Sequence, residues 1–339
     1  MDKPAVVVTS ISAPNAILRE IASGAAKAGF RFIVIGDLKS PADFQLDGCD
    51  FHDVERQRAS HLRFAQICPT RRYARKNIGY LLAIREGAPL ILETDDDNFP
   101  RPGWWNEREM RIKAPCLKAA GWVNVYRYFT DAMIWPRGLP LDEIQKAPVA
   151  FESLAPGEAS CPIQQGLADE NPDVDAIYRL AFSLPQSFQG NRRIILGAGS
   201  WCPFNSQNTA WWRQAYPLLY LPAYCSFRMT DIWRSFVAQR IAWANGWSIL
   251  FHEANVWQER NDHNLMRDFA DEVPGYLHNR AICATLDALP IAPGPDAMGD
   301  NLRRCYGSLV SAGWVGPEEM ELLEAWLDDL VSCQAPPEK

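Results

Sequence analysis

Short apolar runs and helix-like spacing alternate at the start of the chain. Residues 6–8 and 32–35 are continuous apolar runs of the length expected for buried strands. Between them, residues 15–29 have apolar positions at helical spacing and end in Gly29, a residue that commonly terminates helices. A strand, a helix and a strand within about forty residues are typical of a parallel, doubly wound sheet. This opening predicts an α/β fold of the Rossmann type.

A second helix and a third strand continue the pattern. Residues 71–86 carry apolar side chains at helical spacing, and Gly87 follows the last of them. Residues 89–94 then form another apolar run, which leads directly into the acidic run Asp95-Asp96-Asp97. This arrangement predicts a buried strand that ends in three consecutive carboxylates.

The remaining sequence is less regular. Residues 136–175 are rich in Pro, Gly, Ala and acidic residues, which favours a long loop or insertion that could act as a mobile lid. We expect strands at 194–196 and 247–251 and a helix from Thr230 to Asn245. Beyond Val273 we expect helices, with Pro274, Pro290 and Pro317 near their starts.

Ligands of parallel α/β sheets bind beyond the carboxyl ends of the strands. Thr9 and Ser10 follow the first predicted strand, and Asp37 follows the second. We therefore expect all three beside the acidic run, in contact with a nucleotide.

Composition limits the classes of partner. The chain has 339 residues and a net charge of -7, which argues against sequence-independent binding of nucleic acid. No apolar run reaches the roughly 18 residues of a membrane span, and the first residues do not resemble a signal peptide. Nine cysteines without a CxxC pair favour reduced thiols, so we expect a cytoplasmic protein. Thirteen tryptophans either pack in the core or provide stacking surfaces for sugars or a base.

The acidic run is the strongest candidate for chemistry. Crowded carboxylates raise one another's pKa, and a hard divalent cation relieves that repulsion. Mg²⁺ or Mn²⁺ held by Asp95 and Asp97 would leave positions open for diphosphate oxygens. Side chains alternate along a strand, so Asp96 could point away from the other two. The alternative is a solvated acidic turn.

Basic residues of the 71–86 helix are the second candidate. Arg72, Arg75 and Lys76 share one helix face with Gly79 and could neutralise phosphates opposite the metal. The glycine favours a close approach of the ligand to this face. The alternative is an ordinary solvated face.

Three later features complete the candidate site. Asp231 could act as the general base for an acceptor hydroxyl, or it could be the N-cap of its helix. His263 could be a late metal ligand or an ordinary surface histidine. Residues 206–209 offer uncharged donors and acceptors for sugar hydroxyls, although a polar turn is an equally good interpretation.

Several of these stretches resemble a known family. They are TSI at 9–11, VIGD at 34–37, YARKNIGY at 73–80, ETDDDN at 93–98, FNSQNT at 204–209 and RMTDIWR at 228–234. In this order they look like the GT-A class of nucleotide-sugar glycosyltransferases, and more closely like the STELLO-type glycosyltransferases of plants. A fainter likeness is to the UDP-arabinopyranose mutase family of reversibly glycosylated polypeptides.

The resemblance implies a transferase that uses a nucleotide-diphosphate sugar, with UDP as the expected nucleotide, and a hydroxyl acceptor. It implies that Asp95 and Asp97 hold Mn²⁺ or Mg²⁺, that Asp37 contacts the base or ribose, and that Arg75 contacts the diphosphate. Asp231 is then the candidate base or acceptor-orienting group. Plant STELLO-type proteins carry an N-terminal membrane anchor, which we do not expect in this chain.

The predicted organisation combines both lines of reasoning in a GT-A-like, Rossmann-type mixed sheet flanked by helices. It comprises a nucleotide-sugar-binding half (1–135), a loop or lid (136–175), an acceptor-binding half (176–272) and a C-terminal helical extension (273–339). Two alternatives to transfer remain open: a mutase that rearranges the sugar ring, and an inactive nucleotide-sugar-binding protein.

Overall fold

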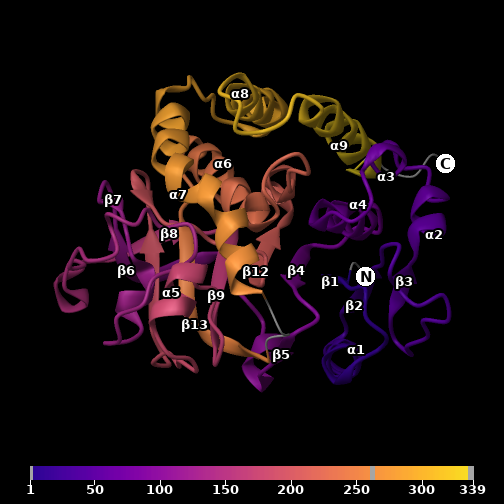
Figure 1. The fold of residues 1–339 in the computed structure, drawn as a ribbon, viewed down its shortest axis with the longest axis horizontal. Coiled ribbons are helices and arrows are strands. Elements are labelled where there is room, and N and C mark those ends of the chain that lie inside the picture. Colours follow the sequence, from indigo (N-terminus) through magenta and orange to yellow (C-terminus); the bar gives the residue numbers. More distant parts are fainter. Residues whose placement is uncertain (1–2, 260–263, 335–339) are drawn as a thin grey trace.

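One mixed sheet of eleven strands runs through the described part of the chain (Figure 1). The computed structural model describes residues 3–259 and 264–334. In sheet order the strands are β3 (Asp50–His52), β2 (Arg31–Ile35), β1 (Ala5–Thr9), β4 (Leu90–Thr94), β12 (Asn208–Trp212), β9 (Ile163–Asp169), β13 (Ile249–Gln258), β10 (Arg193–Leu196), β6 (Arg111–Leu117) and β8 (Pro156–Ser160). The short β5 (Asn98–Pro100) pairs with β13, and β7 (Gly121–Trp122) pairs with β11 (Ser200–Trp201) in a separate ribbon.

The first half is the doubly wound part. Strands β3, β2, β1 and β4 are mutually parallel. Helix α1 (Ala16–Ala28) is capped by the Asn15 side chain and ends at Gly29, whose φ of 77° suits glycine. Val6 and Val8 share a core with α1, whereas Val7 packs with α4 (Lys76–Arg85), because neighbouring strand residues point to opposite faces. The predicted parallel α/β opening is confirmed.

The second half makes the sheet mixed. Strand β12 is antiparallel to both β4 and β9, and β9 is parallel to β13. The register of strand β13 against β9 shifts between His252 and Val256, and the far end of β13 pairs with β5. This end also reaches the acidic run, because the Gln258 side chain donates to Asp97.

Helices cover the sheet and extend beyond it. The remaining helices are α2 (Val54–Arg58), α3 (Arg63–Ile67), α5 (Ala176–Ala181), α6 (Thr230–Ala244), α7 (Leu265–Ala288), α8 (Met298–Ser311) and α9 (Glu319–Gln334). Figure 1 shows α8 and α9 along the upper edge of the molecule and α7 rising to that edge from the middle. Helix α9 packs on α3 and α4 of the first half, so the last helices join both halves. The predicted C-terminal helical region is confirmed.

Three sequence expectations need correction. Residues 136–175 are not a lid-like loop, because they contain β8 and the central strand β9. The helix predicted at 71–86 begins only at Lys76, after a turn of 3₁₀ helix, η1 (Tyr73–Arg75). Pro274 lies inside α7 rather than near its start. Polar, proline-rich flanks hid β9, whose own seven residues are all buried.

The structure also describes the cysteines and the length and character of the helices. All nine cysteines lie in the described part of the chain, and all are free thiols. None of the described helices combines the length and the apolar character needed to cross a bilayer.

Candidate functional site

A cavity of about 710 Å³ lies at the carboxyl ends of β1, β2 and β4. Its walls come from the chain after each of these strands, from the segment before β12 and from the starts of α6 and α7. We call this cavity the main cleft. Eight basic and six acidic residues line it, although the chain as a whole is acidic. The excess of basic side chains favours an anionic ligand.

The acidic run forms a turn at the floor of the main cleft. Strand β4 ends at Thr94, and Asp95, Asp96 and Asp97 all line the cavity. Because the strand has ended, strict alternation no longer applies. Each carboxylate is held by a different part of the fold.

Asp95 is held by the first turn of the helical segment. Its Oδ1 accepts hydrogen bonds from the Tyr73 hydroxyl at 2.6 Å and from Lys76 Nζ at 3.0 Å. Lys76 is fully buried, and its ammonium also reaches the carbonyls of Thr94 and Ser206. Since no described residue donates to Asp95 Oδ2, this oxygen is free for a ligand.

Asp96 and Asp97 are fixed by opposite sides of the turn. Asp96 Oδ2 accepts from the Ser10 hydroxyl at 2.5 Å, and burial, together with the Asp95 charge, raises the pKa of Asp96 despite that bond. Asp97 Oδ2 accepts from Gln258 Nε2 at 2.9 Å. Strand β13 therefore helps to orient the third aspartate.

Residues after β1 and β2 form the neighbouring wall. Thr9, Ser10 and Asp37 line the main cleft, as expected. The Asp37 carboxylate accepts backbone N–H groups of Leu38 at 2.7 Å and Arg71 at 2.5 Å. Asp37 thus anchors the chain before η1 as well as facing the cavity.

The basic side chains separate into two groups. Arg75 lines the cavity but is buried, and its guanidinium donates to Gln57 Oε1 and to the Cys68 carbonyl at 2.9 Å. Burial lowers the pKa of Arg75 from its ordinary value. Lys76 is turned inward to Asp95. Both side chains are buried, so the alternative of an ordinary solvated face is wrong for Arg75 and Lys76. Contact of these two residues with phosphate stays a prediction.

The expectation that Gly79 allows a ligand to approach this helix face closely is also wrong. A Cβ on Gly79 would lie 2.5 Å from Val7 Cγ1 and 2.9 Å from Ile35 Cγ1. The glycine lets α4 approach the sheet and does not face a ligand.

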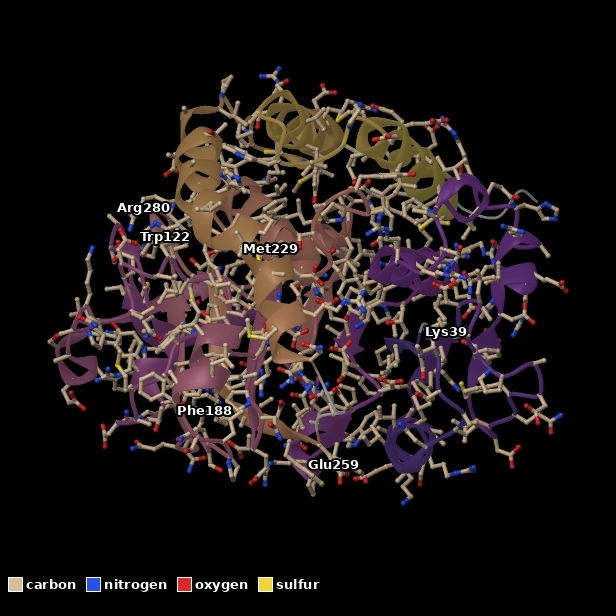
Figure 2. All side chains as sticks on the ribbon, in the orientation of Figure 1. Lys39, Trp122, Phe188, Met229, Glu259 and Arg280 are labelled. Carbon is tan, nitrogen blue, oxygen red and sulfur yellow. The ribbon has the colours of Figure 1, made fainter. Side chains whose placement is uncertain are left out.

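Other basic residues line the rim. Lys39, Arg71, Arg72 and Arg267 line the main cleft, are exposed, and form no side-chain hydrogen bond or ion pair within the described part of the chain. Lys39 is labelled in Figure 2, on the side of the molecule that β1 and β2 occupy. Arg71 has a φ of 59°, an uncommon left-handed conformation for a residue with a side chain. These cations remain available for phosphate.

Asp231 belongs to a charged cluster on the opposite wall. Arg137 donates to both Asp231 oxygens, at 3.1 and 2.8 Å, and to both Asp173 oxygens, each at 2.8 Å. Burial opposes ionisation of Asp173, but the Arg137 charge outweighs it and lowers the pKa of Asp173. Helix α6 begins at Thr230 with Met229 as its N-cap, so the N-cap alternative for Asp231 is wrong.

A fully buried ion pair joins the two walls. Glu93, two residues before Asp95, pairs with Arg234, one turn after Asp231, through contacts of 2.9 and 2.8 Å. Trp211 Nε1 also donates to Glu93 at 2.8 Å. Because both charges are removed from water, the pair is stable only when the carboxylate and the guanidinium keep their hydrogen bonds to each other. The pair fixes α6 relative to β4.

Two further predicted features have different outcomes. Residues 206–209 are buried rather than a solvated turn, and Ser206 shares a 2.6 Å hydrogen bond with the Tyr73 hydroxyl. Only Ser206 and Gln207 of this group line the main cleft. His263, predicted as a late metal ligand or an ordinary surface histidine, lies outside the described residues.

The Asp95 and Asp97 carboxylates suit a hard cation that also binds the phosphate oxygens of a ligand. Among the described residues, no three His, Cys, Asp or Glu side chains converge to hold an ion by themselves. Mg²⁺ and Mn²⁺ commonly use one or two carboxylates and fill their other positions with phosphate oxygens and water. The free Oδ2 of Asp95 and the Asp97 carboxylate fit that pattern.

Sequence reasoning missed several cleft residues. Tyr73 lies within the predicted helix, and nothing in that pattern indicates that its hydroxyl donates to Asp95. Arg137 and Asp173 lie in the segment expected to be a loop, and Gln258 lies at the end of a long strand. No local pattern identifies them, because their role depends on contacts between distant segments.

The fold and the cleft define a mixed α/β protein with an acidic turn and a cationic rim at the carboxyl ends of parallel strands. Residues 228–335 match the family model of STELLO glycosyltransferases. This match covers α6 to α9 and includes Asp231.

Two curated plant proteins are similar over most of the chain. "Probable glycosyltransferase STELLO2" of Arabidopsis thaliana is 26% identical over 332 residues, which is 89% of this chain and 42% of that protein. "Probable glycosyltransferase STELLO1" is 24% identical over 90% of this chain and 41% of its own length. The chain thus spans about two fifths of these relatives. The predicted resemblance to STELLO-type glycosyltransferases is confirmed.

A solved structure, of a mycobacterial protein, aligns over 82% of this chain and 74% of its own, with 10% identity and a TM-score of 0.41.

Proposed function

We propose that this protein is a glycosyltransferase that uses a nucleotide-diphosphate sugar, a divalent cation and a hydroxyl acceptor. One observation carries the proposal: the acidic turn Asp95–Asp97 and the unpaired rim cations Arg71 and Arg72 line the same cleft. Carboxylates and arginines around one cavity are what a metal–diphosphate ligand requires. Similarity to plant proteins named as probable glycosyltransferases supports the same class.

The residues on the two walls would bind different parts of the ligands. Thr9, Ser10 and Asp37 would contact the nucleoside, and Arg71 and Arg72 the diphosphate. Mn²⁺ or Mg²⁺ at Asp95 and Asp97 would supply positive charge to the leaving diphosphate.

The acceptor would enter from the wall that carries Asp231. Its hydroxyl oxygen forms a bond to the anomeric carbon, the bond from that carbon to the diphosphate breaks, and the hydroxyl proton passes to a base. Asp231 faces the cleft, but both of its carboxylate oxygens accept hydrogen bonds from Arg137. We therefore favour Asp231 as the group that orients the acceptor over Asp231 as a free base.

The acidic turn provides the first test. We expect wild-type protein to bind a UDP-sugar in the presence of Mn²⁺, and Asp95→Asn/Asp97→Asn to lose this metal-dependent binding, because neutral amides hold hard cations poorly. Isothermal titration calorimetry measures both. The matched control is Asp43→Asn/Asp47→Asn, which changes two exposed carboxylates outside the cleft.

Unchanged binding by the Asp95→Asn/Asp97→Asn protein would contradict the proposed metal site. Release of UDP on addition of acceptors tests transfer itself. Sugar-ring isomerisation without an acceptor would indicate the mutase instead. Binding without turnover would indicate an inactive nucleotide-sugar-binding protein.

A further inference from the structure

A second hollow opens beside the main cleft. Its volume is about 560 Å³, and it lies where the ends of β5, β9 and β13 come together. We call it the Trp257 groove, and its lining residues are Arg101, Glu170, Asn171, Trp257, Gln258 and Glu259. Glu259 is labelled in Figure 2, close to the position of β5 in Figure 1. Trp257 stands apart from the tryptophan pairs in the sequence, so no local pattern indicates this groove.

Gln258 connects the groove to the acidic turn. It lines both cavities, and its side chain donates to Asp97 at 2.9 Å. Its backbone carbonyl accepts from Asn171 Nδ2 at 3.0 Å on the groove side. A ligand that reacts in the main cleft and continues past Gln258 would therefore enter the Trp257 groove.

The groove combines one aromatic ring with planar polar groups. Trp257 is half-buried and stacks on Phe99, with ring centroids 4.3 Å apart and planes 7° apart. This stack holds the indole in place beside a guanidinium, two amides and two carboxylates. Sugars offer an apolar face to aromatic rings and hydroxyls to such polar groups. The lining therefore suits a saccharide.

Charge argues against an anionic occupant. Two carboxylates, Glu170 and Glu259, line the groove. Its one cation among the lining residues, Arg101, already pairs with Asp169 at 2.7 Å. A phosphate or an acidic chain would meet uncompensated negative charge, whereas neutral hydroxyls could donate to both glutamates.

The backbone at the groove is held in an uncommon conformation. Glu170 has a φ of 69°, in the left-handed region. Reciprocal backbone hydrogen bonds with Gln186, at 2.8 and 3.1 Å, maintain it. Such conformations persist where surrounding contacts impose them, and they are frequent at binding sites.

We infer that the Trp257 groove binds a sugar unit of the acceptor next to the unit that reacts in the main cleft, so that the acceptor is a neutral oligosaccharide or a longer glycan. This inference rests on the proposed function for the identity of the reacting unit. Binding of saccharide to the groove can nevertheless be measured without nucleotide or metal.

The experiment uses the full chain and a panel of neutral tetrasaccharides of glucose, xylose, mannose and galactose, with the matching monosaccharides. Calorimetry without nucleotide should show that at least one tetrasaccharide binds about tenfold more tightly than its monosaccharide, because only the longer ligand spans cleft and groove. Trp257→Leu keeps apolar packing on Phe99 and should weaken that binding about tenfold, as loss of an aromatic anchor does. Binding of UDP-sugar with Mn²⁺ should not change.

Trp314→Leu is the matched control, since Trp314 is also half-buried but lines neither cavity. Glu259→Ala, at an exposed position, gives a second variant if Trp257→Leu melts early, and it should weaken tetrasaccharide binding severalfold. No binding by any tetrasaccharide, or unchanged binding by both groove variants, would overturn the inference. Failure of UDP-sugar binding in the wild type would instead count against the proposed function alone.

Discussion

At the residue scale, Lys76 determines how the acidic turn can be used. A fully buried ammonium is costly unless it is paired and hydrogen-bonded, and Asp95, Tyr73 and two carbonyls satisfy it. The same contacts fix Asp95 through one oxygen and leave the other towards the cleft. A positive charge behind the turn also reduces repulsion among the three aspartates before any cation binds.

Neighbouring arginines should respond differently to the same substitution. Arg72→Gln removes an exposed cation from the cleft, so we expect nucleotide-sugar affinity to fall by roughly tenfold or more with little change in stability. Arg75→Gln removes donors from Gln57 and Cys68 in a buried site, so we expect a loss of about 1–3 kcal/mol in the free energy of unfolding. Calorimetric titration and urea unfolding of both variants measure the two effects. The reverse assignment, with Arg75 controlling affinity and Arg72 stability, would contradict this interpretation.

At the scale of elements, α4 supports the acidic turn from behind through Lys76, and α6 supplies Asp231 to the cleft. Helix α4 is buried on nearly every side, and Gly79 allows it to lie against β1 and β2. Helix α6 is tied to β4 by the Glu93–Arg234 pair. Asn205 extends this tie, because its carbonyl accepts from Arg234 at 3.3 Å and its amide donates to Asp173 at 2.9 Å. The distance between the two walls is therefore set by buried polar contacts.

Gly79 tests the closeness of α4 to the sheet. Gly79→Ala places a methyl group against Val7 and Ile35, so we expect a loss of about 1–3 kcal/mol in the free energy of unfolding. Gly307→Ala is the matched control, because Gly307 also lies in a helix, α8, and an added Cβ there meets nothing within 4 Å. That control should gain about 0.5–1 kcal/mol from reduced backbone entropy of the unfolded chain. Equal effects of the two substitutions in urea unfolding would show that packing at Gly79 is not special.

At the scale of the whole molecule, the C-terminal helices are part of the site's support. Glu319, the first residue of α9, accepts backbone N–H groups of Ala223 at 3.0 Å and Tyr224 at 2.7 Å, together with the Tyr220 hydroxyl. This segment leads into η6 (Phe227–Met229) and the start of α6. Burial raises the pKa of Glu319 to about 7, despite these hydrogen bonds.

The raised pKa of Glu319 predicts how the free energy of unfolding changes with pH. The unfolded carboxyl loses its proton near 4.5, whereas the folded one keeps it to about 7, so the folded state binds more protons in this window. The Glu319 contribution should therefore lower stability as pH rises from 4.5 to 7, by no more than about 3 kcal/mol, and level off above it. Glu319→Gln should remove this dependence, and Glu318→Gln, at the exposed neighbour, should retain it. Identical pH profiles of unfolding for wild type and Glu319→Gln would contradict the prediction.

The sequence by itself determined the features that depend on local periodicity and on strand ends. The apolar runs, the capped helix at 16–28 and the acidic run after β4 follow from short-range preferences, and they placed Asp95, Asp96, Asp97 and Asp37 at one edge of the sheet. Tertiary structure alone decided which charges face the ligand. Arg72 and Arg75 lie on the same short segment, yet one is exposed and the other is buried, because burial depends on what packs against each side chain. Arg137, Asp173 and Gln258 reach the cleft through contacts between segments far apart in the chain, which no local pattern encodes.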